Sequence, residues 1–173
     1  KLIVRIPKND EEYFKWCLDL GVRYIQVPHI QSPSDAKKAI RNSFFGPGGS
    51  RGLCRFVRAA DFSTKEKNDY LKDANSQTKL ILQIEGSEGL AQIDDILKVD
   101  GIDTIFIGPY DLSQSLGKPG LIWDDAVISA MKKIISSCSK ANVKVGTFTD
   151  NPEGVKFWIN SGVKIVQYAS DLH

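Results

Sequence analysis

The chain has 173 residues, of which 42% are hydrophobic and 25% charged, so its composition is that of an ordinary globular protein. Its length favours one domain. The formal net charge is only +2 and the lysine and arginine residues are scattered, which indicates neither a nucleic-acid surface nor a membrane surface. No apolar run approaches the roughly 18 residues of a membrane span, and the charged opening segment is unlike a signal peptide.

Three cysteines, Cys17, Cys54 and Cys138, stand far apart in the sequence without a CxxC pair. An odd number of widely spaced cysteines fits reduced thiols better than a disulfide framework. The pattern predicts a cytoplasmic protein.

Hydrophobic periodicity predicts strands that alternate with helices. We expect strands at residues 2–6, 24–28, 79–85, 104–108, 144–148 and 164–169. We expect helices at residues 9–20, 32–44, 64–77, 87–98, 124–142 and 151–161. A glycine-rich loop occupies residues 45–52, and residues 109–123 form a loop whose unusual length is typical of functional loops.

The strands are nearly continuous apolar runs, which is typical of a parallel sheet covered on both faces. No GxGxxG follows the first strand and no GxxxxGK[ST] is present, so the nucleotide-binding fingerprints are absent. An open doubly wound sheet and a (β/α)8 barrel both fit, although a barrel needs two more strands and about 250 residues. Both ends of the chain look cut out of something longer. We therefore expect a single partial barrel domain over residues 1–173, containing barrel strands 3 to 8 and lacking the first two strands and the last helix.

Two acidic residues follow neighbouring predicted strands in the stretch from Lys79 to Gly117. Parallel strands would bring Glu85 and Asp111 together at their carboxyl ends, where α/β proteins carry their chemistry. Two carboxylates with the remaining positions open suit Mg²⁺ or Mn²⁺. The alternative is that Glu85 caps the next helix and Asp111 caps a turn.

Other polar residues have both a functional and a structural interpretation. Arg5 lies inside an apolar strand, where it either holds an anion or forms a structural ion pair. Gln83 points to the same side of its strand as Glu85, and a plain core hydrogen bond would also explain it. Asp19 ends a helix, where the helix dipole disfavours an acid, although exposed acids at such positions are common.

His29 directly follows the second predicted strand, and an ordinary histidine is the favoured interpretation. The loop at residues 45–52 could cradle an anion through its N–H groups and Arg51. No clear helix follows it, so a plain turn is favoured.

Seven stretches, taken in order, resemble the HpcH/HpaI aldolase/citrate lyase family, and in particular its 4-hydroxy-2-oxo-acid and 2-dehydro-3-deoxyglucarate aldolases. They are LIVRIPKND, LDLG, IQVP, GGSRG, LQIEGSEGL, VDGIDTIFIGPYDLSQSLG and residues 162–171. The combination of QIE with IGPYDLS is the specific part.

The resemblance implies a TIM barrel of the phosphoenolpyruvate/pyruvate type in a homo-oligomer, usually a hexamer. It implies a metal-dependent (class II) aldolase that cleaves a 4-hydroxy-2-oxo acid to pyruvate and an aldehyde through a metal-bound pyruvate enolate. The metal would be Mg²⁺ or Mn²⁺, with Co²⁺ as a third candidate, and the family's metal acids fall on Glu85 and Asp111.

The resemblance also assigns roles to further residues. The family's transition-state arginine falls on Arg5, and its pyruvate contacts fall on Gln83 and the backbone N–H groups of Tyr110 and Asp111. The acid that raises the basicity of the catalytic histidine falls on Asp19.

The chain departs from the family pattern in places. The catalytic histidine of the family lies upstream of Lys1, and neither His29 nor His173 matches it, so this chain alone is expected to lack its general base. Tyr110 stands where many relatives have Ala, which would narrow the aldehyde side of the pocket. The alternatives are a CoA-ester lyase of the citrate lyase type and a non-catalytic barrel fragment.

Overall fold

Six strands form one parallel sheet in the structure, a computed structural model that describes residues 2–168. The strands are β1 Ile3–Arg5, β2 Tyr24–Val27, β3 Lys79–Ile84, β4 Thr104–Ile107, β5 Lys144–Thr149 and β6 Ile165–Tyr168. The six predicted strands are confirmed, with ends that differ by at most one residue. Ala169 and His173 lie outside the described residues.

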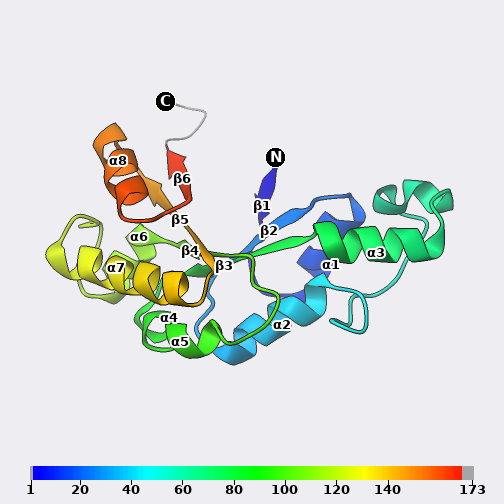
Figure 1. The fold of residues 1–173 in the computed structure, drawn as a ribbon, viewed down its shortest axis with the longest axis horizontal. Helices are drawn as coiled ribbons and strands as arrows, with labels where there is room; N and C mark the ends of the chain where they lie inside the picture. Colours follow the sequence, from blue (N-terminus) through cyan, green and yellow to red (C-terminus); the bar gives the residue numbers. More distant parts are fainter. Residues whose placement is uncertain (1, 169–173) are drawn as a thin grey trace.

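The order of the strands decides between the two fold classes that the sequence left open. A doubly wound sheet reverses its strand order at a switch point, whereas a β/α barrel adds each strand beside the previous one. Here every neighbouring pair is consecutive in sequence and parallel. The sheet curls into a half-barrel with β1 and β6 at the edges of its open side (Figure 1). The doubly wound alternative is therefore wrong.

Helices lie around the outer side of the curled sheet (Figure 1). They are α1 Glu11–Asp19, α2 Pro33–Ser43, the 3-10 helix η1 Arg58–Ser63, α3 Lys67–Gln77, α4 Ser87–Ala91, α5 Ile93–Ile96, α6 Pro109–Ser115, α7 Asp125–Lys140 and α8 Pro152–Asn160. Ser32, Asp124 and Asn151 each accept a hydrogen bond of 2.6–3.2 Å from a first-turn N–H of α2, α7 and α8. These caps satisfy N–H groups that a helix leaves unpaired, and so they fix where the three helices begin.

The core lies between the sheet and the helices. Successive side chains of a strand point to opposite faces, so alternate residues reach the helices. The fully buried strand residues in this core are Ile25, Val27, Leu80, Leu82, Ile84, Ile105 and Ile107. The concave face instead carries polar and aromatic side chains such as Gln26, Gln83 and Phe106, which are also buried. The central strands are therefore buried on both faces as expected, but helices cover only the convex face.

Three segments differ from the sequence-based expectation. The predicted loop at residues 109–123 begins with α6, whose first residue is Pro109, a position where the missing N–H is not needed. The predicted helix at residues 87–98 is divided into α4 and α5 by Gln92, which has φ −101° and ψ 9°. Arg5 is exposed rather than inside a buried strand, because β1 is an edge strand paired only with β2.

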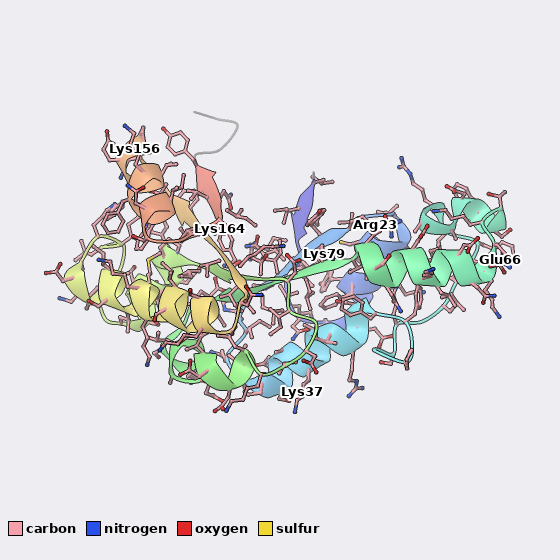
Figure 2. All side chains as sticks on the ribbon, in the orientation of Figure 1. Arg23, Lys37, Glu66, Lys79, Lys156 and Lys164 are labelled. Atoms are coloured by element: carbon pink, nitrogen blue, oxygen red, sulfur yellow. The ribbon has the colours of Figure 1, made fainter. Side chains whose placement is uncertain are left out.

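The surface carries dispersed charge over the described elements. Lys37, Glu66 and Lys156 project from separate parts of the chain (Figure 2). No helix within residues 2–168 is both long and apolar enough to cross a membrane.

Leu82 is a suitable probe of the core because it lies in β3 with no exposed surface. We expect Leu82→Ala to lower the free energy of unfolding by about 2–5 kcal/mol, because it removes buried methyl groups and leaves a cavity. Urea denaturation followed by circular dichroism measures this change. Leu53→Ala, at a side chain that is 51% exposed, is the control and should change stability by less than about 0.5 kcal/mol. Equal losses in the two variants would contradict the assigned core.

Candidate functional site

A small cavity of about 190 Å³ lies at the carboxyl-end edge of the sheet. Each strand contributes one side chain to its lining: Arg5, Gln26, Gln83, Phe106, Phe148 and Gln167. The end of β4 and the start of α6 complete it with Gly108, Pro109, Tyr110 and Asp111. The fold thus brings four predicted site residues, Arg5, Gln83, Tyr110 and Asp111, to one cavity.

A chain of buried polar side chains runs beneath this cavity. Gln26 Nε2 donates to Gln83 Oε1 at 2.5 Å, and Gln83 Nε2 donates to Glu85 Oε2. The three side chains are only 4–7% exposed. Buried polar groups stay stable only when they are hydrogen-bonded, so this chain holds Glu85 in one orientation beside the cavity. Gln83 therefore has both the core hydrogen bonds of the structural interpretation and a place in the cavity wall.

His29 holds the other oxygen of the Glu85 carboxylate. Its backbone N–H donates to Glu85 Oε1 at 2.9 Å, and its Nδ1 lies 3.1 Å from the same oxygen. The residue has φ +54°, a left-handed conformation that is uncommon for residues other than glycine. Sequence reasoning favoured an ordinary histidine here. The sequence did hold an indication of this contact. His29 closely follows β2 and Glu85 directly follows β3, and the carboxyl ends of neighbouring parallel strands lie at the same edge of a sheet.

Gly108 connects β4 to α6 at close range to Glu85. A Cβ at this position would lie 2.8 Å from Glu85 Oε2 and 3.0 Å from Gln83 Nε2. Only glycine leaves room for the carboxylate, so β3 and β4 meet closely where Asp111 follows in the first turn of α6.

The local capping alternatives are not observed for the two acids. The residue that caps α4 is Gly86 rather than Glu85. The side chain of Asp111 is exposed and forms no hydrogen bond or ion pair with any other residue in the range 2–168. Both carboxylates are therefore available to a ligand in this region.

The donor types at this site fit a hard divalent cation. Glu85 is 4% exposed, and within residues 2–168 no lysine or arginine forms an ion pair with it. A buried carboxylate without a cationic partner is costly, and a bound cation would relieve that cost. The described residues contain no group of three or more His, Cys, Asp or Glu side chains placed to hold a metal. Two carboxylates would leave the other positions to oxygens of water or substrate, as Mg²⁺ and Mn²⁺ accept.

Asp19 lies away from this cavity. It ends α1, which runs antiparallel to the strands, so it lies near their amino ends and borders a different, more apolar cavity. Its Oδ1 pairs with Arg51 Nη2 at 2.7 Å, and its Oδ2 pairs with Lys15 Nζ at 3.4 Å. Arg51, in the glycine-rich loop, is buried and also stacks over the ring of Phe45. Arg51 Nη2 also donates to the Tyr70 hydroxyl of α3 at 3.4 Å. Arg51 therefore joins the loop to α1 and α3 instead of being free to bind an anion.

Comparison with known proteins places the chain in a family. The whole chain, residues 1–173, matches the HpcH/HpaI aldolase/citrate lyase family. The chain belongs to this family. The assignment from the sequence motifs is thereby confirmed.

Relatives of the chain carry aldolase names. It is 33% identical over 174 residues to the hydroxypyruvate/pyruvate aldolase of Paraburkholderia phytofirmans, covering 98% of this chain and 66% of that protein. It is 32% identical over 170 residues to the 4-hydroxy-2-oxo-heptane-1,7-dioate aldolase of Shigella flexneri, covering 98% of this chain and 63% of that one. The chain thus spans about two thirds of the length of these curated relatives.

Solved structures of the HpcH/HpaI family share the fold. A family member from Burkholderia cenocepacia, 33% identical, superposes with a TM-score of 0.93 over 98% of this chain and 67% of that one. The six-stranded half-barrel is therefore the arrangement that this family adopts over the matched region.

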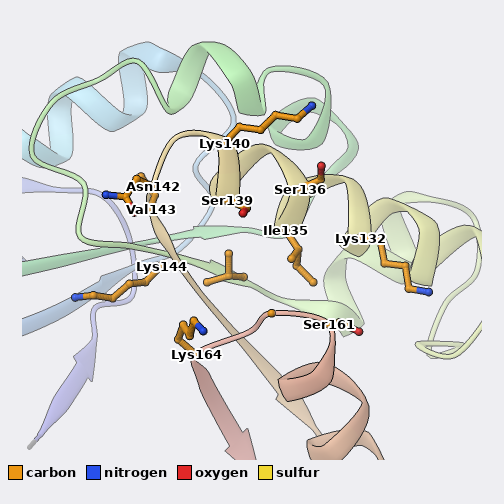
Figure 3. A pocket seen from close by; sticks show the side chains of 12 residues that line it. Lys132, Ile135, Ser136, Ser139, Lys140, Asn142, Val143, Lys144, Ser161 and Lys164 are labelled. Atoms are coloured by element: carbon orange, nitrogen blue, oxygen red, sulfur yellow. The ribbon is translucent and has the colours of Figure 1, made fainter.

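A larger cavity of about 670 Å³ lies at the opposite edge of the sheet, between the end of α7 and the starts of β5 and β6. Its rim carries Lys132, Lys140, Lys144 and Lys164, but Figure 3 shows Lys132, Lys140 and Lys144 extending away from one another. Lys144 is already paired with Asp103 at 3.2 Å. This cavity therefore lacks the converging polar groups of the small cavity.

Two of the three thiol groups, those of Cys17 and Cys138, are poorly suited to act as nucleophiles. Burial raises the pKa of the Cys138 thiol to about 12 and also raises that of Cys17. Thiols with raised pKa values carry little thiolate at neutral pH, and the thiolate is the reactive form.

Gly108→Ala tests the close approach of β4 to Glu85. We expect the added methyl group to displace the Glu85 carboxylate and to lower the free energy of unfolding by about 1–3 kcal/mol, because nearby atoms must shift. Urea denaturation measures the stability. Gly48→Ala, where no atom lies within 4 Å of the new Cβ, is the control and should be close to neutral. A neutral Gly108→Ala would mean that the end of β4 does not approach Glu85 in this way.

Asp19→Ala tests the structural role of Asp19 as the ion-pair partner of Arg51. The change leaves the Arg51 guanidinium buried without its partner, so we expect a loss of about 3–5 kcal/mol of unfolding free energy. Thermal and urea unfolding measure it. Lys15→Ala removes only the partly exposed partner of Asp19 and should cost about 0–1 kcal/mol. A stable Asp19→Ala protein would argue that the Arg51 contact contributes little.

Proposed function

We propose that this chain forms the metal- and pyruvate-binding part of a class II aldolase, which cleaves a 4-hydroxy-2-oxo acid to pyruvate and an aldehyde. One observation carries the proposal. Arg5, Gln83, Tyr110 and Asp111 border a single small cavity, and the buried carboxylate of Glu85 lies beside it. We further propose that the half-barrel is completed to an eight-stranded TIM barrel by segments beyond those described, within a homo-oligomer.

The chain's own groups suit a 2-oxo acid. First-turn N–H groups of a helix have no acceptor within the helix, so those of Tyr110 and Asp111 are free to bind the pyruvate carboxylate. The Gln83 amide would contact the same end of the substrate. The exposed guanidinium of Arg5 would add positive charge near the oxygen that becomes negative when the carbon–carbon bond breaks, a preorganised electrostatic effect.

Glu85 and Asp111 would hold the divalent cation, with Mg²⁺ or Mn²⁺ favoured and Co²⁺ as a third candidate. Such an ion, when bound, would act as a Lewis acid and neutralise negative charge on the pyruvate part. Gln83 and His29 orient the Glu85 carboxylate, as hydrogen-bond partners of metal-ligating groups generally do.

The proton transfers need a base that we do not assign to a described residue. His29 contacts Glu85 and is proposed here to orient that carboxylate. Asp19 stays a prediction as the acid that assists a catalytic histidine. Asp19 lies at the opposite edge of the sheet, and among the described residues no hydrogen bond or ion pair joins it to a residue that lines the cavity.

The names of the relatives support the pyruvate part of the proposal and differ in the aldehyde part. The relative from Paraburkholderia phytofirmans is named a hydroxypyruvate/pyruvate aldolase, and the relative from Shigella flexneri is named a 4-hydroxy-2-oxo-heptane-1,7-dioate aldolase. Family membership alone therefore leaves the aldehyde open.

Glu85→Gln tests the proposed function. We expect the chain to bind pyruvate in the presence of Mn²⁺, and we expect Glu85→Gln to weaken this binding by about 100-fold, because an amide replaces the charged metal ligand. Isothermal titration calorimetry with pyruvate, with and without Mn²⁺, measures the affinity.

Glu88→Gln, an exposed acid in the first turn of α4, is the matched control and should bind as the wild type does. Glutamine keeps the shape of Glu85 but only one of its two acceptor oxygens, so circular dichroism of the variant checks that it is folded before the affinities are compared. Pyruvate binding that is unchanged in Glu85→Gln, or that does not need the metal, would overturn the proposal.

A further inference from the structure

An aromatic and acidic wall stands at the mouth of the small cavity. We call it the mouth wall and define it as Tyr110, Phe148 and Asp150. The rings of Tyr110 and Phe148 both line the cavity, with centroids 6.0 Å apart. The Tyr110 hydroxyl donates to Asp150 Oδ2 at 2.9 Å. The wall therefore joins the start of α6 to the end of β5.

The Asp150 carboxylate is held in place on both oxygens. Asn151 Nδ2 donates to its Oδ1 at 3.0 Å, while Asn151 Oδ1 caps α8. Asp150 comes two residues after Phe148, and alternate residues of a strand point to one side. Tyr110 and Asn151 both donate to Asp150, so its carboxylate accepts both bonds and carries the negative charge of the mouth wall.

This negative charge has no basic partner in the described chain. Asp150 is exposed and forms no ion pair with a lysine or arginine of residues 2–168. The cationic side chain of the cavity lining is Arg5, on β1, which is separated from β5 by three strands in the sheet. The cavity therefore has a cationic lining residue at β1, and at β5 an aromatic lining whose Tyr110 hydroxyl is bonded to the Asp150 carboxylate.

We propose that the mouth wall selects the aldehyde part of the substrate, favouring a hydroxyl-bearing aldehyde and disfavouring one that ends in a carboxylate. This inference rests on the proposed function, in which the 2-oxo end lies deeper in the cavity, against Gln83 and α6. A fixed carboxylate accepts a hydrogen bond from a substrate hydroxyl and repels a second carboxylate. The Tyr110 and Phe148 rings offer an apolar surface to the carbon atoms between the two ends.

Two ligands that differ only at the distal end test the mouth wall. These are 5-hydroxy-2-oxopentanoate, which ends in a hydroxyl, and 2-oxoglutarate, which ends in a carboxylate. In calorimetry with Mn²⁺ we expect the wild type to bind 5-hydroxy-2-oxopentanoate about tenfold more tightly than 2-oxoglutarate. The reason is that the distal carboxylate of 2-oxoglutarate would be repelled by Asp150 near the surface. Asp150→Asn should bring the ratio of the two affinities close to one. Asp150→Ser removes the same charge and is a second variant with the same expected result.

Asp125→Asn is the matched control. It removes an exposed acid in the first turn of α7 that, unlike Asp150, forms no hydrogen bond to a lining residue of the cavity among residues 2–168, and it should keep the wild-type ratio. If the wild type binds pyruvate but shows no preference, or if both Asp150 variants keep the preference, the inference is overturned and the proposed function stands. If the wild type binds no 2-oxo acid, the proposed function fails and the inference fails with it.

Discussion

The buried hydrogen-bond chain from Gln26 through Gln83 to Glu85 is the interaction on which the site depends. A carboxylate that is 4% exposed must be satisfied, and here the partners come from the ends of β2 and β3. The carboxylate in turn requires a glycine at position 108, directly after the adjacent strand β4. The buried Glu85 carboxylate thus contacts residues at the ends of β2, β3 and β4 and holds these three strand ends close together. The cavity lies at these strand ends.

In the half-barrel, the residues that form the core and the residues that line the cavity lie on opposite faces of the sheet. Its convex face buries aliphatic residues against the helices, while its concave face turns Gln26, Gln83 and Phe106 toward the cavity. At the amino ends of the strands the buried Arg51–Asp19 pair joins the glycine-rich loop to α1. Within the described residues Asp19 is thus a half-buried structural partner of Arg51.

Under the proposed function the cavity would have two sides with different roles. The side at Gln83 and the start of α6, beside Glu85, would hold the part of the substrate that the aldolases named among its relatives have in common. The other side includes Asp150, which follows β5 in a loop, and loops on a rigid scaffold are where related proteins differ in specificity. Tyr110 would serve both sides, because its backbone N–H is proposed to bind the substrate carboxylate and its hydroxyl donates to Asp150.

The sequence by itself determined the six strands, the parallel class, the family and the pairing of the β3 and β4 ends, because hydrophobic periodicity and the QIE and IGPYDLS motifs are local signals. It did not determine that helices cover one face only, that α6 begins at Pro109, that Arg5 is exposed, or that His29 and Gly108 enclose Glu85. Those features depend on which strands are edges and how sharply the sheet curls, and both are set by contacts between residues far apart in the chain. For the same reason only the tertiary structure separated Asp19 from the other predicted site residues and brought Tyr110 to Asp150.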